Sequence, residues 1–407
     1  MTINVLHIVG GSLNNGAAKG ANILHEALLD LGVNSKILND TQAKNQINNV
    51  NLKNENIIFI QKNIFDKVLH KIYIFVEKIL KSFFLHSPRE TFTISLFGFD
   101  ITKIKEYQEA DLIHIHWFCQ GFINLKSLSK VDKPIIWTMR DEWAFTGGAH
   151  YKSDFEKYEK SYTSKLLKNY KKRIYNKNFQ FVALSNWLKT KAEKSDIINK
   201  SQIIKIDNNI QLKDFIPIDK DVAKSILGLT TKKQIILYGA QNPQSQRKGW
   251  KIFLETLKVL DKSKFFLLIF GKFWSHELLD KIGVNYKSLG FVTNKYILNA
   301  LYSSGDIFVA SSLQDAWPKT FAEAMYCATP AVCFDQTSIS EIVEHKKNGF
   351  IVKKREPKAL KDGITWLLNK TKKNNLIGLQ AREKIKNYDS KIIAKKYLNL
   401  YKKKLLK

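Results

Sequence analysis

Short apolar runs rich in β-branched residues alternate along the chain with longer segments in which apolar residues recur every three or four positions. The short runs show no polar alternation, as is typical of strands that are buried on both faces of a parallel sheet. The longer segments, such as 21–31, 251–259 and 318–327, have the period of amphipathic helices. The predicted strands are 4–9, 35–38, 57–60, 112–116, 135–138 and 181–184 in the first half, and 235–238, 265–270, 307–310, 331–334 and 350–352 in the second.

This repeated strand–helix order predicts parallel sheets joined by right-handed crossovers. A chain of 407 residues is too long for a single hydrophobic core. We therefore expect an α/β protein with two Rossmann-like domains, 1–205 and 206–385, and a C-terminal helix at 386–407. The join is expected close to 208–210, before Pro217. Because ligands of open parallel sheets bind at the carboxyl ends of the strands, we expect the site in a cleft between two facing sheets.

Two acidic residues, Asp315 and Glu323, stand around a predicted helix start in the second half. Pro318 suits the first position of a helix, which places Glu323 in the second turn and leaves Asp315 in the preceding loop. Carboxylates accept strong hydrogen bonds from sugar and ribose hydroxyls, although Glu323 could equally face solvent. The free N–H groups of a helix start attract phosphate, and the first residues here are Lys319, Thr320 and Phe321.

A second motif lies earlier in the same half, where Gly239 follows a predicted strand and a basic pair, Arg247 and Lys248, precedes the next helix. A glycine directly after a strand lets the backbone approach a phosphate closely. Lysine and arginine can neutralise a diphosphate. In so basic a protein, a basic pair alone is weak evidence for such a site.

The first half carries polar residues where its predicted strands end. The alternation around His114 and His116 places both rings on one face of their strand, either as site residues or as satisfied interior histidines. Arg140 and Asp141 follow the next strand. A His-x-His pair can bind metal, but no cysteine or carboxylate set completes such a site, so we expect none. A glycine-rich loop after the first strand, without the spacing of a dinucleotide fingerprint, includes Gly11, Gly16 and Ala17.

These segments resemble the retaining GT-B glycosyltransferases of group 1 (family 4), of the type found in bacterial surface-polysaccharide pathways. The likeness rests on Asp315, seven intervening residues, and Glu323 followed by Ala-Met-x-Cys-x-x-Pro-x-Val, where the usual first acid is Glu. The resemblance implies that Asp315 contacts the donor sugar, that Glu323 holds the ribose and that Lys248 takes the place of the family's lysine. It also implies that the glycine-rich first loop faces the donor phosphates and the acceptor.

The chain departs from the family pattern at further points. Ala240 stands near the usual arginine position, so Arg247 is expected to supply that charge. Many relatives have Thr-x-His-Asp, with a histidine that contacts the donor sugar, where this chain has Arg140 and Asp141 after Thr138. Either Arg140 donates that hydrogen bond or Asp141 acts alone, and His116 joins them as a candidate catalytic residue.

The resemblance implies a hexosyltransferase that moves a sugar, with retention and without metal or cofactor, from a UDP- or GDP-linked donor. The acceptor is expected to be a glycan or lipid-linked glycan in polysaccharide biosynthesis. Lys248, Arg247 and the helix start near Thr320 would stabilise the leaving diphosphate. The alternatives are a GT-B epimerase or phosphorylase, or a non-catalytic protein that binds a sugar or nucleotide.

The net charge of +29 has three readings: solvated lysines, attraction to an anionic membrane, or attraction to nucleic acid. No nucleic-acid-binding motif is visible, so we expect no nucleic-acid partner. The three cysteines form no metal or disulfide pattern, and no leader or membrane-spanning run is seen, which favours a cytoplasmic protein. The positive charge leaves a peripheral position on the inner membrane face open as an alternative.

Two terminal or surface helices complete the prediction. Segment 63–85 is expected to face the core, with a basic helix on the membrane surface as the alternative. Segment 391–406 is expected to bury a stripe of Ile392, Tyr397, Leu400 and Leu405, and in relatives the last helix packs on the N-terminal domain. The apolar stripe of 63–85 is Phe65, Val68, Leu69, Ile72, Val76, Ile79, Leu80 and Phe83, with Lys67, Lys71, Lys78 and Lys81 on the other face.

Overall fold

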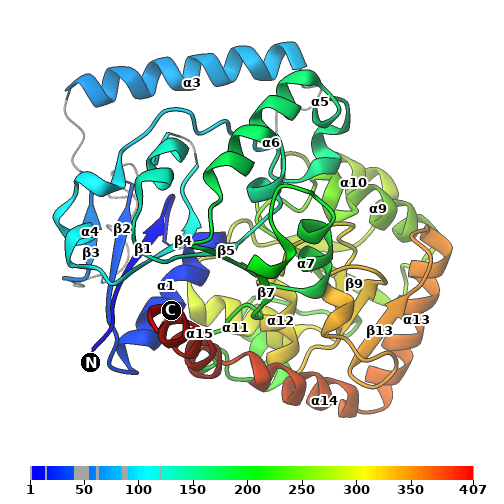
Figure 1. Ribbon diagram of the computed structural model, residues 1–407. Helices are drawn as coiled ribbons and strands as arrows, with labels where there is room; N and C mark the ends of the chain where they lie inside the picture. Colours follow the sequence, from blue (N-terminus) through cyan, green and yellow to red (C-terminus); the bar gives the residue numbers. More distant parts are fainter. Residues whose placement is uncertain are drawn as a thin grey trace. The chain divides into compact units, whose positions relative to one another are not determined.

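The computed structural model describes residues 2–13, 16–40, 55–60, 64–84, 90–119 and 121–406. The chain divides into two units (Figure 1). The N-terminal unit comprises Met1–Asn209 and Ser390–Lys407, and the C-terminal unit comprises Ile210–Asp389. The final helix therefore belongs to the N-terminal unit, although the whole of the other unit precedes it in the sequence.

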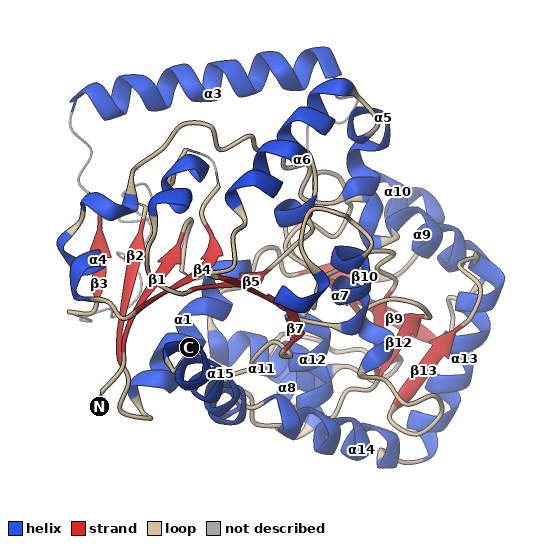
Figure 2. Cartoon of the chain, viewed as in Figure 1, coloured by secondary structure: helices blue, strands red, loops and turns tan. Residues whose placement is uncertain are grey.

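The N-terminal unit is built on a sheet of seven strands in the order β3-β2-β1-β4-β5-β6-β7. All neighbouring strands pair in parallel. The chain crosses from one side of β1 to the other when it enters β4, so the carboxyl ends of these two strands lie together at the switch point of the sheet. The strands, red in Figure 2, are β1 Asn4–Val9, β2 Asn34–Asn39, β3 Ile57–Phe59, β4 Leu112–Trp117, β5 Ile135–Met139, β6 Phe179–Ala183 and β7 Ile203–Lys205.

Helices pack around this sheet, and the core forms where α1 meets the C-terminal helix α15. Leu24 and Leu28 of α1 share one buried cluster with Ile136 of β5 and with Tyr397 and Tyr401 of α15. Burial of these apolar surfaces stabilises the docked C-terminal helix. The α-helices of this unit are α1 Gly16–Leu29, α3 Ile64–Phe84, α4 Lys105–Glu109, α5 Glu156–Glu159, α6 Tyr162–Ile174, α7 Asn186–Glu193 and α15 Ser390–Leu405.

The buried stripe of α15 differs in part from the predicted one. Tyr397 and Leu400 are buried as predicted, but Ile392 is 43% and Leu405 is 37% exposed. The prediction was wrong at both ends because the buried face is centred on Ile393, Ala394 and Tyr401. An error of one residue in phase moves a side chain about 100° around a helix.

The C-terminal unit has a sheet of six strands, all paired in parallel, in the order β10-β9-β8-β11-β12-β13. Here β8 and β11 are neighbours, so their carboxyl ends form the switch point. The strands are β8 Gln234–Gly239, β9 Phe265–Phe270, β10 Tyr286–Ser288, β11 Ile307–Ala310, β12 Ala331–Phe334 and β13 Gly349–Val352, and the α-helices are α8 Lys220–Ile226, α9 Trp250–Val259, α10 Glu277–Ile282, α11 Lys295–Ser304, α12 Lys319–Tyr326, α13 Pro357–Lys373 and α14 Leu376–Ile385.

Helix α3 does not face the core, which corrects the favoured prediction. Phe65 is 69% exposed, Ile72 is 51% and Phe75 is 64%. The side chains of Leu80, Phe83, Lys78 and Lys81, which the prediction also used, lie outside the described residues. Within the described part of the chain, no helix is both long enough and apolar enough to cross a membrane.

Candidate functional site

A pocket opens at the switch point of the C-terminal sheet. Gly239 ends β8, and Ser311 follows β11, so the two strand ends deliver their loops to the same place. The start of α12 closes the third side of this pocket. The lining residues are Tyr238, Gly239, Ala240, Pro243, Lys248, Phe308, Val309, Ala310, Ser311, Ser312, Pro318, Thr320, Phe321 and Ile339.

The loop that carries Lys248 is tied tightly to the end of β11. Gly249 has a positive φ of 70°, and a Cβ there would lie 2.0 Å from the Ser311 carbonyl oxygen. The hydroxyl of Ser311 donates to the Lys248 carbonyl oxygen at 2.9 Å. Only glycine fits this approach, and it fixes the backbone of Lys248 beside the pocket.

Lys248 and Asp315, far apart in the sequence, form an ion pair. The Nζ atom of Lys248 contacts Oδ2 of Asp315, and the nearest Arg247 nitrogen lies 4.0 Å from the same oxygen. The other carboxylate oxygen of Asp315 accepts a hydrogen bond from the Trp317 N–H at 3.2 Å. Both charged side chains are largely buried, at 12% and 11% exposure, so a ligand that reaches this point meets a cation and an anion together.

Helix α12 presents its N-terminus to the same pocket. Pro318 is the residue before the helix, with extended backbone, and not its first residue as the sequence predicted. No side chain caps the helix start. Thr320 and Phe321 line the pocket, and Lys319 begins the helix. The free N–H groups and the helix dipole make this point attractive to a phosphate group.

Glu323 lies in α12 and is buried, at 4% exposure. The alternative in which it faces solvent is therefore wrong. Its Oε2 atom accepts a hydrogen bond from the Tyr302 hydroxyl at 2.9 Å, and burial together with this carboxylate raises the pKa of Tyr302 well above its ordinary value. Glu323 is not among the residues that line the pocket, so its contact with a ribose stays a prediction.

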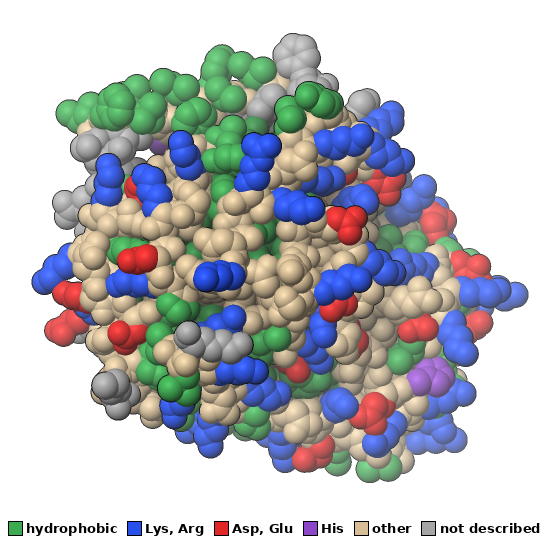
Figure 3. Space-filling view, in the orientation of Figure 1, with side chains coloured by type: hydrophobic (Ala, Val, Ile, Leu, Met, Phe, Trp, Pro, Cys, Tyr) green, Lys and Arg blue, Asp and Glu red, His purple; other side chains and the backbone are tan. Residues whose placement is uncertain are grey.

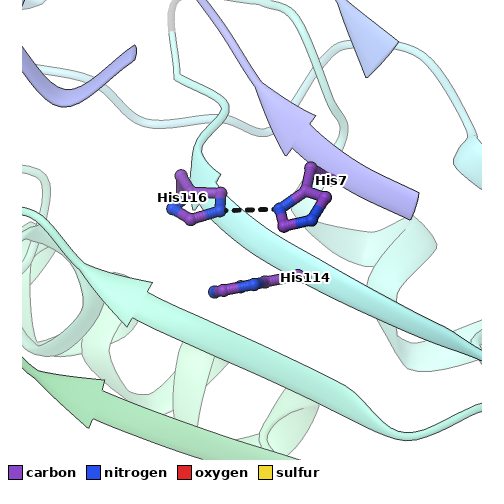
Figure 4. A group of neighbouring side chains, drawn as sticks. All are labelled: His7, His114 and His116. Carbon is purple, nitrogen blue, oxygen red and sulfur yellow. Dashed lines mark hydrogen bonds between the residues drawn. The ribbon is translucent and has the colours of Figure 1, made fainter. Parts of the chain in front are cut away.

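In the N-terminal unit, three buried histidines gather at the β1–β4 switch point (Figure 4). His7 of β1 stands opposite His114 in the parallel register. Its Nδ1 atom lies 3.0 Å from Nε2 of His116. Sequence reasoning singled out His114 and His116 but missed His7. The usable signal was the strand order, because neighbouring parallel strands place residues of the same face side by side.

Arg140 determines how the protons of this cluster are arranged. Its Nη2 atom lies 3.0 Å from Nδ1 of His116, and its Nη1 atom donates to Oδ1 of Asn208 at 2.8 Å. A guanidinium only donates, so His116 accepts at Nδ1 and carries its proton on Nε2, which points at His7. Neutral His7 then accepts at Nδ1 and keeps its proton on Nε2, which has no hydrogen-bond partner among the described residues.

The cluster is neutral except for Arg140. Burial lowers the pKa of His7 and His116 well below the ordinary range, and the nearby cation of Arg140 contributes to both shifts. Burial also lowers the pKa of Arg140 to about 10, so the guanidinium stays charged at neutral pH. In the described part of the chain no carboxylate pairs with Arg140. A half-buried cation without a paired carboxylate favours the approach of an anionic or hydroxyl-rich ligand.

His114 is an interior histidine whose hydrogen bonds are satisfied. Its Nδ1 atom lies 2.6 Å from the Tyr401 hydroxyl, and its Nε2 atom lies 2.8 Å from Oγ1 of Thr138. His116, by contrast, lines a second pocket together with Arg140 and Asp141. The remaining lining residues of that pocket are Trp117, Phe118, Cys119, Trp137, Met139, Trp143 and Ala144.

The three histidines also have the spacing of a metal site, because one nitrogen from each lies within 4.8 Å of the others. Two observations weigh against that use. Both nitrogens of His114 and Nδ1 of His116 are already engaged in hydrogen bonds. A divalent cation would also be repelled by the guanidinium of Arg140.

Asp141 is oriented by its neighbours in the N-terminal unit. Its Oδ2 atom lies 2.6 Å from Nδ1 of His150, and its Oδ1 atom accepts from the Trp143 N–H at 2.9 Å. Nε2 of His150 in turn lies 3.1 Å from Oγ1 of Thr93. Asp141 therefore has a fixed position next to Arg140, with a histidine as its direct partner.

The glycine-rich loop lies at the start of α1. Gly11 has a positive φ of 80° and Gly16 one of 44°, and Ala17 is half-buried in the first turn. None of the three lines the pocket of Arg140. Helix α1 approaches that side chain at Gly20, where a Cβ would lie 2.6 Å from Nη1 of Arg140. Sequence reasoning missed Gly20, because a glycine inside a helix gives no sign of its partner.

Comparisons with known proteins found a matching family model and several relatives. Residues 219–384 match the family model described as glycosyl transferases, group 1. The chain is 28% identical over 207 residues to an N,N'-diacetylbacillosaminyl-diphospho-undecaprenol alpha-1,3-N-acetylgalactosaminyltransferase of Campylobacter jejuni, covering 50% of this chain and 54% of that protein. The chain spans about half the length of the first curated relatives it matches.

Solved structures resemble the whole chain. HepE of Anabaena, in complex with UDP and glucose, has a TM-score of 0.70 at 16% identity, with 98% of this chain and 100% of that chain covered. A glycosyltransferase of Rickettsia africae has a TM-score of 0.67 at 17% identity, with 99% of both chains covered. Together with the two parallel sheets, this likeness confirms the predicted GT-B fold.

Proposed function

The chain belongs to the group 1 glycosyltransferases through residues 219–384, and from this premise we propose that it moves a sugar from a nucleotide-sugar donor to a glycan or lipid-linked glycan. The observation that carries the proposal is the meeting of Gly239, Lys248 and the start of α12 at one pocket, with Asp315 on Lys248. A strand-end glycine, a cation and a helix N-terminus are the groups that a diphosphate needs.

In the proposed reaction the donor diphosphate lies between Lys248 and the first N–H groups of α12. The bond from the anomeric carbon to the diphosphate oxygen breaks, and the acceptor hydroxyl oxygen bonds to the same carbon from the same face. The hydroxyl proton passes to the departing diphosphate. Lys248 and the helix start stabilise the charge that develops on the leaving group, and no metal is required for this role.

Two acids position the donor in this scheme. Asp315 exchanges part of its contact with Lys248 for a sugar hydroxyl, since Lys248 then faces the diphosphate. Glu323 serves the ribose through its second oxygen, with Tyr302 holding the first. Arg140 supplies the sugar contact that a histidine makes in the resembling family, and His116 and Asp141 fix its surroundings.

The acceptor is proposed from a relative and not from a pocket. The Campylobacter jejuni relative is named for an undecaprenol diphosphate substrate. A lipid-linked acceptor of that kind would carry a diphosphate of its own.

A binding experiment tests the donor site. Purified protein is screened with UDP- and GDP-sugars by thermal unfolding, where a ligand at 100 times its Kd stabilises by about 2.7 kcal/mol. Calorimetry then compares Lys248→Ala with Lys258→Ala, whose surface ion pair with Glu255 lies outside the pocket. We expect roughly tenfold or greater weakening for Lys248→Ala and no change for the control.

Unchanged nucleotide affinity in Lys248→Ala would contradict the assigned role. Turnover assays separate the alternatives. Hydrolysis of the donor with inversion at a sugar carbon would indicate an epimerase, phosphate-dependent release without nucleotide a phosphorylase, and binding without turnover a non-catalytic protein.

A further inference from the structure

Helix α3 of the N-terminal unit carries an uncovered apolar face. At about 100° per residue, eight of its exposed apolar side chains fall on one arc of about 140°, and only Ile74, which is 37% exposed, lies outside it among the described side chains of the helix. In Figure 3, hydrophobic side chains form a band where α3 lies, with lysine and arginine side chains below it. The residues of this face, with their exposed fractions, are Ile64 81%, Phe65 69%, Val68 49%, Leu69 37%, Ile72 51%, Phe75 64%, Val76 37% and Ile79 39%.

The opposite side of α3 is the one that holds it to the protein. Tyr73 is buried, at 2% exposure, and its hydroxyl accepts a hydrogen bond from the Ser95 N–H at 3.1 Å. A Cβ on Gly121 would lie 2.7 Å from Nδ1 of His70, so the chain passes directly beneath this side of the helix. The position of the helix is therefore fixed by Tyr73 and His70, and its apolar arc points away from the unit.

Two further exposed apolar side chains lie close to the helix in the sequence or in space. Phe97, which is 48% exposed, packs edge-on against Tyr73 with ring centroids 6.0 Å apart, and Leu96 is 41% exposed. Soluble monomers rarely leave so large a contiguous apolar patch in water, and such patches mark interaction surfaces.

The charges around this face are mainly positive. Lys67 and Lys71 are exposed and lie just beyond one edge of the apolar arc. The sequence of α3 holds four lysines against two acidic residues, within a chain of net charge +29. An apolar arc bordered by lysines is the pattern of a helix that lies in the plane of an anionic bilayer surface.

We propose that α3 inserts its apolar face into the headgroup region of an anionic lipid bilayer, with Lys67 and Lys71 at the phosphate level. A second copy of the chain fits this face less well, because a symmetric contact would bring the same lysines of both copies together. Among the described helices, α3 included, none is long and apolar enough to cross a membrane. The proposal does not depend on the transfer chemistry, since it concerns a surface and not a pocket.

The test uses the full-length protein and vesicles that contain neither donor nor acceptor. Sedimentation with phosphatidylcholine vesicles, with and without phosphatidylglycerol, measures partitioning at low and high salt. We expect binding to the anionic vesicles at low salt. Binding should be lost at high salt, because the Debye length there is about 8 Å or less. Phe65→Glu/Phe75→Glu should lower that partitioning by roughly tenfold or more.

Matched variants keep the test interpretable. Ile226→Glu/Leu376→Glu introduces the same charges at exposed apolar positions, 51% and 57%, in the C-terminal unit, and should bind as the wild type does. Lys67→Glu/Lys71→Glu should weaken binding to anionic vesicles and leave the free protein folded. Nucleotide binding, measured separately by calorimetry, should be the same in all these variants. A failed membrane proposal can therefore be told apart from a failed donor-site proposal.

Three results would overturn the proposal. One is equal partitioning of the α3 variant and its matched control. Another is equal binding to neutral and anionic vesicles at all salt concentrations. The third is a dimer in light scattering that Phe65→Glu/Phe75→Glu converts to a monomer, which would assign the face to a second copy.

Discussion

The two units share one architecture but hold opposite kinds of chemistry at their switch points. In the C-terminal unit, Lys248 and Asp315 form an ion pair beside an uncapped helix start. In the N-terminal unit, Arg140 is a half-buried cation whose hydrogen-bond partners, His116 and Asn208, are neutral. An ion pair can exchange partners with a charged ligand at little cost, whereas a half-buried cation without a paired carboxylate favours an anionic ligand. The comparison indicates that the C-terminal site suits a ligand with both a diphosphate and hydroxyls, and the N-terminal one a group that is anionic or accepts hydrogen bonds.

The largest expected effect separates the two units by function. Arg140→Ala should lower the transfer rate about 10²–10³-fold and leave the affinity for free nucleoside diphosphate unchanged, because Arg140 belongs to the other unit. Arg173→Ala, an exposed arginine of the same unit, should change neither quantity. Steady-state rates and calorimetry measure the two outcomes. If Arg140→Ala lost as much nucleotide affinity as transfer rate, the proposed division of function between the two units would be wrong.

The next effect divides the two acids of the C-terminal unit. Glu323→Gln should weaken nucleoside diphosphate binding ten- to a hundredfold, since a lost charge-assisted hydrogen bond costs roughly 1.5–3 kcal/mol. Asp315→Asn should nearly retain that binding and lose turnover, because a free nucleotide has no sugar for it to hold. Tyr302→Phe is the control that removes the partner of Glu323 but keeps its charge. If Asp315→Asn abolished nucleotide binding while Glu323→Gln left it intact, the two roles would be assigned wrongly.

Acid should unfold the N-terminal unit before the other. Burial lowers the pKa of His25 from 6.5 to about 4, and it lowers those of His7, His114 and His116 as well. Between pH 6.5 and about 4 the histidines are protonated in the unfolded chain but not in the folded one. Stability therefore falls as pH falls through this range. The protonation of His25 alone lowers the free energy of unfolding by about 2 kcal/mol at pH 5 relative to neutral pH.

The measurement is hydrogen exchange resolved by unit at pH 7 and pH 5. The C-terminal unit contains two histidines, and neither is buried, so its protection should change less. His25→Gln should flatten the pH dependence of the N-terminal unit. An equal loss of protection in both units would contradict this explanation.

The smallest effect concerns how the C-terminal helix is held. Tyr401→Phe removes the hydroxyl that meets His114 and should cost about 1 kcal/mol of unfolding free energy. Tyr296→Phe, at an exposed tyrosine of the C-terminal unit, should cost nothing measurable. Denaturant unfolding of the two variants gives the difference directly. Identical midpoints would mean that the polar contact of α15 adds nothing to its apolar packing.

The order of strands and helices could be predicted from the sequence because buried parallel strands are continuous apolar runs. The strands at 265–270, 307–310 and 331–334 have the predicted bounds. The two missed strands, Ile203–Lys205 and Tyr286–Ser288, are short and lie at sheet edges. An edge strand is held by pairing on one side only, so its sequence need not be apolar throughout.

Only the tertiary structure decided which way α3 faces. Its sequence period specifies an apolar arc but does not say whether protein, lipid or another chain covers that arc. The buried side chain of Tyr73 holds the helix by the side that the pattern did not mark. The prediction of a core-facing helix failed for this reason, and the alternative became the basis of the membrane proposal.

The sequence by itself determined the fold class, the family resemblance and the candidate residues, because strand patterns and local motifs are written in contiguous residues. Tertiary structure alone decided that Lys248 pairs with Asp315, that His7 completes the histidine cluster, and that Arg140 packs on Gly20. Each of these contacts joins residues that are far apart in the chain. Such contacts depend on the order and register of strands, which no local motif specifies.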